Sequence, residues 1–209
     1  LSWKNGTLPH GNTNCGKYHA DPTECGVNIK DSNKTLTGSG PATWTHDHTP
    51  TGVHDLCGNV LEIVRGLRIK DGALWAAENN DAAMPETDLT TCGDGWKPIV
   101  DSNGDQVYVD AMDGIKFTNE KPQHGRANFE SWEDVRMECW SDQLMELGLF
   151  AGEKKAYCAV DATEGEYLPL RGGYWGNGGD AGLFDLDLIH PRGFSSWGFG
   201  GRSAYFKKR

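Results

Sequence analysis

The sequence predicts one α+β domain built from short antiparallel strands, one or two helices and much loop. Three observations predict it. Residues 1–50 are polar and rich in Gly, Asn, Thr and Pro, β-prone runs then alternate with turn-forming residues, and one stretch near residue 140 has helical spacing. A chain of 209 residues can bury a sizeable core. Because no internal repeat or linker is visible, we expect a single domain over 1–209.

Two hairpins are expected in the first half of the chain. In GVHDLCGNVLEIVRGLRIKDGALW (52–75), two apolar runs are separated by Gly66 and by the turn Lys70-Asp71-Gly72, which indicates a hairpin or a short meander. In WKPIVDSNGDQVYVD (96–110), two β-prone runs flank the turn 101–104. Strands joined by such short turns pair antiparallel.

A helix is expected after the second hairpin. Ser131 and Asp134 resemble a capping box, and apolar side chains then recur at helical spacing at Trp132, Val135, Cys139 and Leu144 or Met145. Gly148 is a typical helix stop. The pattern therefore predicts a helix that begins at Ser131 and ends at Gly148.

The charge and hydropathy of the chain exclude several partners. A net charge of −10 disfavours nucleic acid, which attracts a basic face. No apolar run reaches the roughly 20 residues that a membrane span needs, so we expect no membrane insertion. The chain begins at Leu1 and not at Met, so it is expected to be the C-terminal part of a longer protein. The oligomeric state stays open.

Two clusters contain metal-ligand side chains. Oxygen-bearing side chains stand at alternate positions at Asp101, Asn103 and Asp105, as at the start of a calcium-binding loop. The position of Gly104 and the absence of a closing Glu favour a simple hairpin turn instead. His46, His48 and His54 are the second cluster, and they support an alternative hypothesis of a metal-dependent enzyme. Polar loops collect such residues by chance, so we expect no metal and no cofactor.

The six cysteines show no C-x-x-C spacing, so a structural zinc site has little support. Cys15 and Cys25 bracket a turn-rich stretch. A disulfide between them and free thiols remain equal alternatives. No G-x-S-x-G motif is present, and no cysteine lies in an evidently electropositive setting, so nucleophilic catalysis is not expected.

The closing segment RGGYWGNGGDAGLFDLDLIHPRGFSSWGFGGRSAYF (171–206) has an unusual composition. It contains no Lys, Glu, Gln or Met, whereas the preceding 170 residues contain 10 Lys, 12 Glu, 3 Gln and 4 Met. At that rate about six would be expected in the segment. Its Tyr, Ser, Gly and Asn residues are those in which adaptable binding surfaces are enriched. Within it, strand alternation places Phe184, Leu186 and Leu188 on one face. Asp185, Asp187 and Ile189 are expected on the other.

Two motifs carry a resemblance to a known family. HDLCGNVLEIV (54–64) resembles the D-x-x-G-N-V-W-E-W segment of the formylglycine-generating-enzyme-like branch of the C-type-lectin fold. Arg171-Gly172-Gly173-Tyr174-Trp175 resembles the R-G-G-S-W of that branch, and GFGGR (198–202) is a longer form of its G-F-R. Leu61 and Ile63 replace the two tryptophans, and no cysteine follows Cys158, whereas the enzymes of the branch carry active cysteines near R-G-G. The resemblance therefore implies the fold without that enzymatic activity.

More closely, RGGYWGNGGDAGLFDLDL and SSWGFGGRSA resemble the variable region of diversity-generating-retroelement target proteins of phage and prophage type. Such retroelements randomise template adenines, typically in asparagine codons, and the resulting NNY codons cannot encode Lys, Glu, Gln, Met or Trp. That rule accounts for the four missing residue types. It also implies that Trp175 and Trp197 are scaffold.

The resemblance implies a diversified ligand-binding domain that is not an enzyme. We expect it to bind a protein or glycan on a bacterial surface, as a receptor-binding or tail-tip component of a virion, or to lie on the bacterial cell surface. A structural virion module that does not vary is a further alternative. The expected variable contact surface consists of Tyr174, Gly176, Asn177, Asp180, Asp187, Ile189, His190, Gly193, Phe194, Ser195 and Ser196. The expected scaffold consists of Arg171, Trp175, Phe184, Leu186, Leu188 and Arg202.

Overall fold

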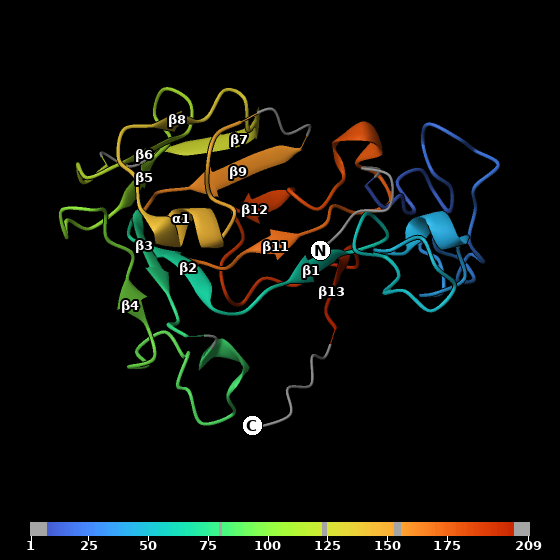
Figure 1. Ribbon diagram of the computed structural model, residues 1–209, viewed down its shortest axis with the longest axis horizontal. Coiled ribbons are helices and arrows are strands. Elements are labelled where there is room, and N and C mark those ends of the chain that lie inside the picture. Colours follow the sequence, from blue (N-terminus) through green and yellow to red (C-terminus); the bar gives the residue numbers. More distant parts are fainter. Residues whose placement is uncertain (1–7, 80, 123–124, 153–155, 203–209) are drawn as a thin grey trace. The chain divides into compact units, whose positions relative to one another are not determined.

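The computed structural model describes residues 8–79, 81–122, 125–152 and 156–202 (Figure 1). Its internal contacts group the chain into two compact units, each assembled from stretches that are far apart in sequence. The first unit comprises 1–62, 170–186 and 195–200, and the second comprises 63–169, 187–194 and 201–209. The expectation of a single domain stays a prediction.

Short strands and loops make up most of the described chain, as the sequence predicts. The described α-helix is α1 (Asp142–Glu146), and brief 3-10 turns occur at Ala42–Trp44, Asp81–Ala83 and Gly178–Asp180. Most of the described strand pairs are antiparallel. β1 (Leu61–Ile63) with β13 (Phe199–Gly200) and β6 (Lys116–Thr118) with β8 (Arg136–Met137) are parallel, so the sheets are mixed. No helix within the described ranges is both long and apolar enough to cross a membrane.

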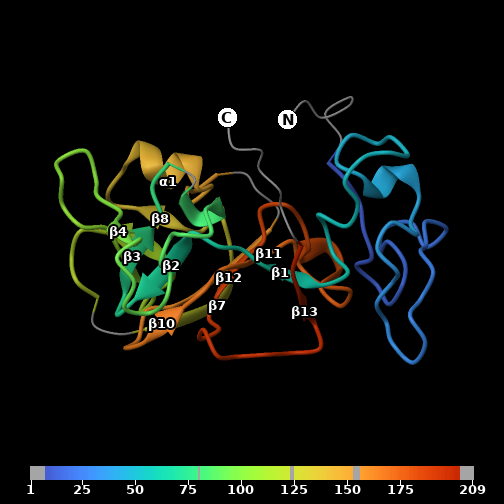
Figure 2. The same ribbon diagram turned by 90° about the horizontal axis from the view of Figure 1, so that it is seen from below.

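The second unit contains a seven-stranded sheet in the order β10-β2-β3-β5-β6-β8, with β4 paired to β3. Figure 2 shows β2, β3 and β4 side by side. The bounds are Glu166–Tyr167 for β10, Leu67–Lys70 for β2, Ala73–Ala76 for β3, Tyr108–Asp110 for β5, Lys116–Thr118 for β6, Arg136–Met137 for β8 and Lys97–Pro98 for β4.

The first predicted hairpin is confirmed as β2 and β3. Lys70 pairs with Ala73, which leaves a two-residue loop of Asp71 and Gly72. Both loop residues have positive φ, 51° and 79°. A two-residue hairpin loop with this geometry matches the right-handed twist of its strands, which is why Asp-Gly is a frequent sequence there.

The second predicted hairpin is also confirmed. Val100 pairs antiparallel with Gln106. The side chain of Asp101 closes the turn, because its Oδ1 accepts the backbone N–H groups of Asn103 at 2.8 Å and Asp105 at 3.0 Å. These N–H groups, chiefly that of Asp105, lower the pKa of the Asp101 carboxyl. The carboxylate of Asp101 therefore stabilises the hairpin turn, which was the expected role of this cluster.

The predicted start of the helix is wrong. Ser131 is the last residue of β7 (Arg126–Ser131), and β8 follows before any helix begins. The helix α1 starts after Ser141, whose Oγ accepts the N–H of Leu144 at 3.1 Å. Its end is close to the predicted position, since Gly148 has a φ of 70° just beyond it.

The apolar residues that suggested the longer helix are nevertheless buried. Trp132, Val135, Cys139 and Leu144 have exposed fractions of 8% or less. Trp132 reaches the core from a turn, Val135 and Cys139 from loop residues on either side of β8, and Leu144 from α1. The hydrogen bonds of β8 with β6 hold residues 136–137 in an extended conformation. This strand pairing overrides the helical spacing of the apolar residues.

A further strand of the second unit lies beside a strand of the closing segment. β9 (Tyr157–Asp161) pairs antiparallel with β7 and lies next to β12 (Leu186–Leu188). The largest fully buried side chains of this unit include Trp132, Phe117 and Leu188. They form part of the apolar core of this unit.

The first unit is mostly loop and depends on buried polar contacts. The carboxamide Oδ1 of Asn59 accepts the N–H of Thr35 at 2.8 Å and the Nδ2–H of Asn12 at 3.2 Å. All three residues are buried. Buried amides of this kind stabilise a loop-rich fold only when they are hydrogen-bonded, as they are here.

Candidate functional site

The structure brings together, within the first unit, the three segments that resemble the lectin-like branch. The N–H of Gly58 donates to the carbonyl of Gly172 at 2.8 Å, and that of Leu61 to the carbonyl of Gly198 at 2.9 Å. β1 (Leu61–Ile63) lies between β13 (Phe199–Gly200) and β11 (Leu170–Arg171). The first motif segment is therefore a neighbour in space of the other two, although it lies more than 100 residues before them in sequence.

Glycine is required where these segments meet. Gly58 has a φ of 71°, and a Cβ there would lie 2.3 Å from the carbonyl oxygen of Asn12. That distance is far shorter than any normal contact, so a larger residue would displace the backbone. The Gly-Asn of HDLCGNV is thus explained by local packing.

An aromatic cluster stands beside this junction. Trp175 and Trp197 stack with ring centroids 5.1 Å apart, and Tyr174 meets both edge-on at 5.3 and 6.5 Å. Trp197 is 64% exposed, the largest exposed fraction of any aromatic residue described. The backbone carbonyl of Trp197 accepts the Nζ–H of Lys34 at 3.0 Å. Exposed, pre-positioned aromatic rings are frequent at interaction sites.

A tight turn positions Tyr174. The N–H of Tyr174 donates to Oδ1 of Asn177 at 2.7 Å, and the N–H of Asn177 donates to the Tyr174 carbonyl at 3.0 Å. Asn177 therefore has a structural role in addition to its predicted contact role. At Gly176 a Cβ would lie 3.0 Å from the Tyr174 ring, so substitution there would move that ring.

The other expected contact residues of the first unit are accessible. Asp180 and Ser195 are exposed, and Ser196 is half-buried, with its Oγ accepting the N–H of Gly198 at 3.3 Å. Together with Tyr174 and Asn177 they contribute the small and polar side chains of this part of the predicted surface.

In the second unit, His190 and Phe194 form a stacked pair. Their ring centroids are 4.5 Å apart, and Phe194 is 47% exposed. Gly193 is exposed, and a Cβ built on it would meet nothing within 4 Å. This loop can therefore accept larger side chains at Gly193 without steric cost.

Two residues of the predicted contact surface are not on the surface. Asp187 and Ile189 are only 6% and 8% exposed. All three residues of β12 are buried, so both faces of the strand are covered and the expected alternation of buried and exposed side chains fails. The assignment of Asp187 and Ile189 as outward contact residues is wrong.

Asp187 instead supports the loop that follows it. Its Oδ1 accepts the N–H of Ile189 at 3.0 Å, and its Oδ2 lies 3.3 Å from Nε2 of His190. Burial raises the pKa of the Asp187 carboxyl, while the Ile189 N–H and His190 act in the opposite direction. Asp187 thereby orients the ring of His190, which Phe194 covers.

The expected scaffold residues differ in burial. Leu186 and Leu188 are 0% and 1% exposed, in agreement with a core role. Phe184, Trp175 and Arg171 are half-buried, and Arg202 is exposed. The framing role of the two arginines stays a prediction.

The histidine cluster gains no support as a metal site. His46 uses its Nδ1 to accept the N–H of Val53 at 2.8 Å. In the part of the chain that the structure describes, no three His, Cys, Asp or Glu side chains are arranged to hold a metal ion. The metal-dependent alternative therefore has no observed ligand set.

None of the six cysteines forms a disulfide, which decides against a bond between Cys15 and Cys25. These two and Cys92 are exposed, whereas Cys57, Cys139 and Cys158 are buried. Burial, with the nearby Asp185 and Asp55 carboxylates, raises the pKa of the Cys57 thiol to about 12.

We expect Cys57 to resist alkylation in the folded protein. Only the thiolate reacts, and burial removes both the thiolate and the access of the reagent. Iodoacetamide at pH 8, followed by peptide mass spectrometry, should modify Cys15, Cys25 and Cys92 at least about tenfold faster than Cys57. Unfolding in urea should abolish that difference, and equal rates in the folded protein would contradict it.

Sequence reasoning missed an ionic network in the second unit that includes the buried side chains of Glu166 and Arg68. Glu166 forms ion pairs with Arg68 at 2.7 Å and with Arg192 at 2.5 Å, and accepts the hydroxyl of Thr91 at 2.8 Å. The Arg68 guanidinium also lies 4.3 Å from the ring centroid of Trp96. The residues of this network come from distant parts of the sequence, so no local sequence pattern could reveal the network.

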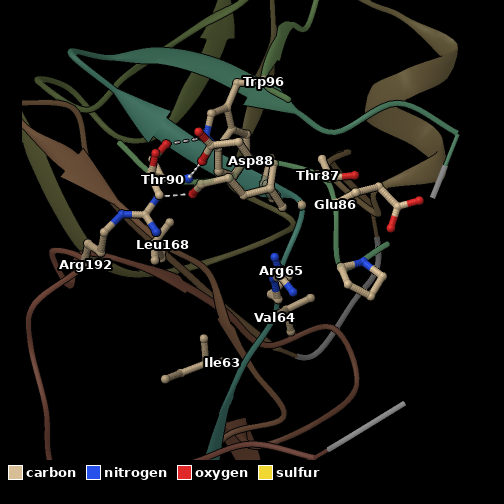
Figure 3. A pocket seen from close by; sticks show the side chains of 14 residues that line it. Ile63, Val64, Arg65, Glu86, Thr87, Asp88, Thr90, Trp96, Leu168 and Arg192 are labelled. Atoms are coloured by element: carbon tan, nitrogen blue, oxygen red, sulfur yellow. Dashed lines mark hydrogen bonds between the residues drawn. The ribbon is translucent and has the colours of Figure 1, made fainter. Parts of the chain in front are cut away.

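A pocket of about 470 Å³ lies next to this network, within the second unit (Figure 3). Ile63, Val64, Leu168 and Trp96 supply apolar surface. Arg65, Arg192 and the loop 85–90 supply polar groups. The volume falls within the range of about 300–1,000 Å³ that is typical of small-molecule sites.

The comparisons with known proteins leave the family open. No protein-family model matches the chain, and no curated protein is significantly similar to it. The geometry of the site therefore carries the functional argument.

Proposed function

We propose that this chain is a retroelement-diversified ligand-binding domain with a C-type-lectin-like fold of the formylglycine-generating-enzyme-like branch. One observation carries the proposal. The segment that lacks Lys, Glu, Gln and Met supplies an aromatic cluster in which half-buried Tyr174 and Trp175 contact the exposed ring of Trp197. The mixed sheets and the junction of the three motif segments in the first unit support the lectin-like assignment.

Binding would combine a constant aromatic anchor with variable neighbours. Trp175 and Trp197 cannot arise from NNY codons, so they would be the same in every variant. Tyr174, with Asp180 and Ser195 in the first unit, would vary around them. Trp and Tyr supply large contact areas at low cost in conformational entropy, whereas small polar residues adapt to the partner.

The second unit contributes a separate set of variable positions, His190, Gly193 and Phe194. Asp187 and Ile189 are not part of the proposed contact surface, because they are buried. The partner would be a protein or glycan on a bacterial surface, with the chain acting in a virion tail or on the cell surface, without catalysis.

The proposal is tested by reading the codons for 165–209 in many genomes that carry this gene, together with the flanking DNA. We expect a near-copy of the segment nearby, and substitutions at exposed Gly193 and Phe194 and at half-buried Tyr174. Trp175, Trp197 and the buried Leu188 serve as internal controls and should be invariant. A segment without variation and without a near-copy would overturn the proposal and favour a structural virion module.

A further inference from the structure

Four charged residues line the pocket of the second unit, and two of them, Arg65 and Glu86, have no hydrogen bond or ion pair within the described ranges. Arg192 is held by Glu166 and also donates to the carbonyl of Leu89 at 2.9 Å. The indole Nε1–H of Trp96 donates to the carbonyl of Thr90 at 3.0 Å. These groups maintain the walls of the pocket and are not available to a ligand.

Arg65 differs from them. Its side chain is exposed and lines the pocket, and no hydrogen bond or ion pair to it is found among the residues that the structure describes. Its backbone neighbours are fixed, since the N–H of Val64 donates to the carbonyl of Pro169 at 3.1 Å and that of Ala77 to the carbonyl of Gly66 at 2.9 Å. The guanidinium is thus an unneutralised cation on a well-anchored segment.

Apolar surface adjoins this cation. Ile63 and Val64 are 50% and 40% exposed, which is unusual for adjacent β-branched aliphatic residues in a folded domain. Both line the pocket, as does Leu168. Exposed apolar area beside a convergent charged group is the usual composition of a small-molecule site.

We propose that this pocket binds a small aliphatic carboxylate, with its hydrocarbon chain against Ile63, Val64 and Leu168 and its carboxylate paired with the Arg65 guanidinium. The planar guanidinium offers two parallel N–H donors, a geometry that matches a carboxylate. This inference does not depend on the proposed function, because none of these four residues belongs to the predicted variable surface.

The acidic residues at the pocket do not neutralise Arg65. Asp88 uses its Oδ1 to accept the N–H of Thr90 at 2.9 Å, and that bond lowers the pKa of the Asp88 carboxyl. Figure 3 shows Asp88 turned toward Thr90 and the Glu86 side chain extending away from Arg65. An anionic headgroup beside Arg65 is therefore favoured over a cationic one.

The test uses three probes of equal chain length that differ in charge, namely sodium octanoate, octan-1-ol and octylamine. Each is titrated into the ¹⁵N-labelled protein, and the backbone amide signals of residues 63–67 and 86–90 are followed by NMR. We expect octanoate to shift these signals and to bind more tightly than octanol, with octylamine weakest. The variant Arg65→Gln should weaken octanoate binding by about tenfold, the effect of removing a charge-assisted hydrogen-bonded partner.

Two further variants make the result specific. Val64→Ser should weaken octanoate and octanol alike, by about threefold, because it removes apolar contact. Lys121→Gln removes an exposed positive charge elsewhere in the same unit and should leave octanoate binding unchanged. Arg65 makes no recorded bond within the described residues, so Arg65→Gln is expected to fold normally, which a thermal melt checks.

Three results would overturn the inference. They are no binding of any probe to the wild-type protein, equal octanoate affinity in Arg65→Gln, or preferential binding of octylamine. The last would assign the site to a cation held by Glu86. None of these results would bear on codon variation in the closing segment.

Discussion

Replacement of Glu166 by Gln is expected to lower the free energy of unfolding by about 3–5 kcal/mol, the usual cost of removing one partner from a buried ion pair. The side chains of Glu166 and Arg68 are 7% and 5% exposed. Glutamine can still accept hydrogen bonds but carries no charge, so the Arg68 guanidinium would remain buried without a counterion. Arg192 would lose the same partner.

The Glu166 carboxylate should also make the free energy of unfolding depend on pH in the acidic range. Its pKa lies at about 2, below its ordinary value of 4.5, although burial alone would raise it, because Arg192, Arg68 and Thr91 donate hydrogen bonds to the charged form. The folded state therefore gains stability from Glu166 above pH 4.5, and this gain is lost as the pH falls from about 4.5 through 2.

Urea unfolding of wild-type protein, Glu166→Gln and Glu86→Gln, measured at pH 7 and at pH 3, checks both statements. Glu86 is exposed in the same unit, so Glu86→Gln is expected to change stability by no more than about 0.5 kcal/mol. The loss caused by Glu166→Gln should shrink at pH 3. An equal effect of the two variants at pH 7 would contradict the assigned network.

Leu188→Ala is expected to destabilise the protein by about 2–5 kcal/mol, because it removes a side chain that is only 1% exposed and leaves a cavity in the core. Phe194 belongs to the same segment and the same unit, but it is 47% exposed. Phe194→Ala should therefore cost no more than about 1 kcal/mol, including its stacking with His190.

Thermal and urea unfolding of the two variants would decide whether the closing segment combines a fixed core with replaceable surface positions. The expected difference of several kcal/mol is what allows diversification without loss of fold. A large loss in Phe194→Ala would mean that His190 and Phe194 form part of the core. In that case, they could not be variable contact positions.

Local structure was predictable where the signal is local. The Asp71-Gly72 loop and the turn closed by Asp101 are formed by adjacent residues, so their chemistry is readable from the chain alone. The start of the helix was not predictable, since residues 136–137 pair with a strand about 20 positions earlier. Pairing with a distant strand decides the secondary structure of such a segment, and the spacing of a few apolar residues contains no information about that pairing.

The candidate site shows the same division. The sequence by itself determined which residue types the closing segment contains and avoids, the motif segments around Gly58 and Gly172, and the positions of the turns. Only the tertiary structure decided that Asp187 and Ile189 are buried, that Trp197 is exposed, and that Glu166 joins Arg68 to Arg192. The physical reason is that composition and turn chemistry act over a few neighbouring residues, whereas burial and ion pairing depend on which distant segments the folded chain brings into contact.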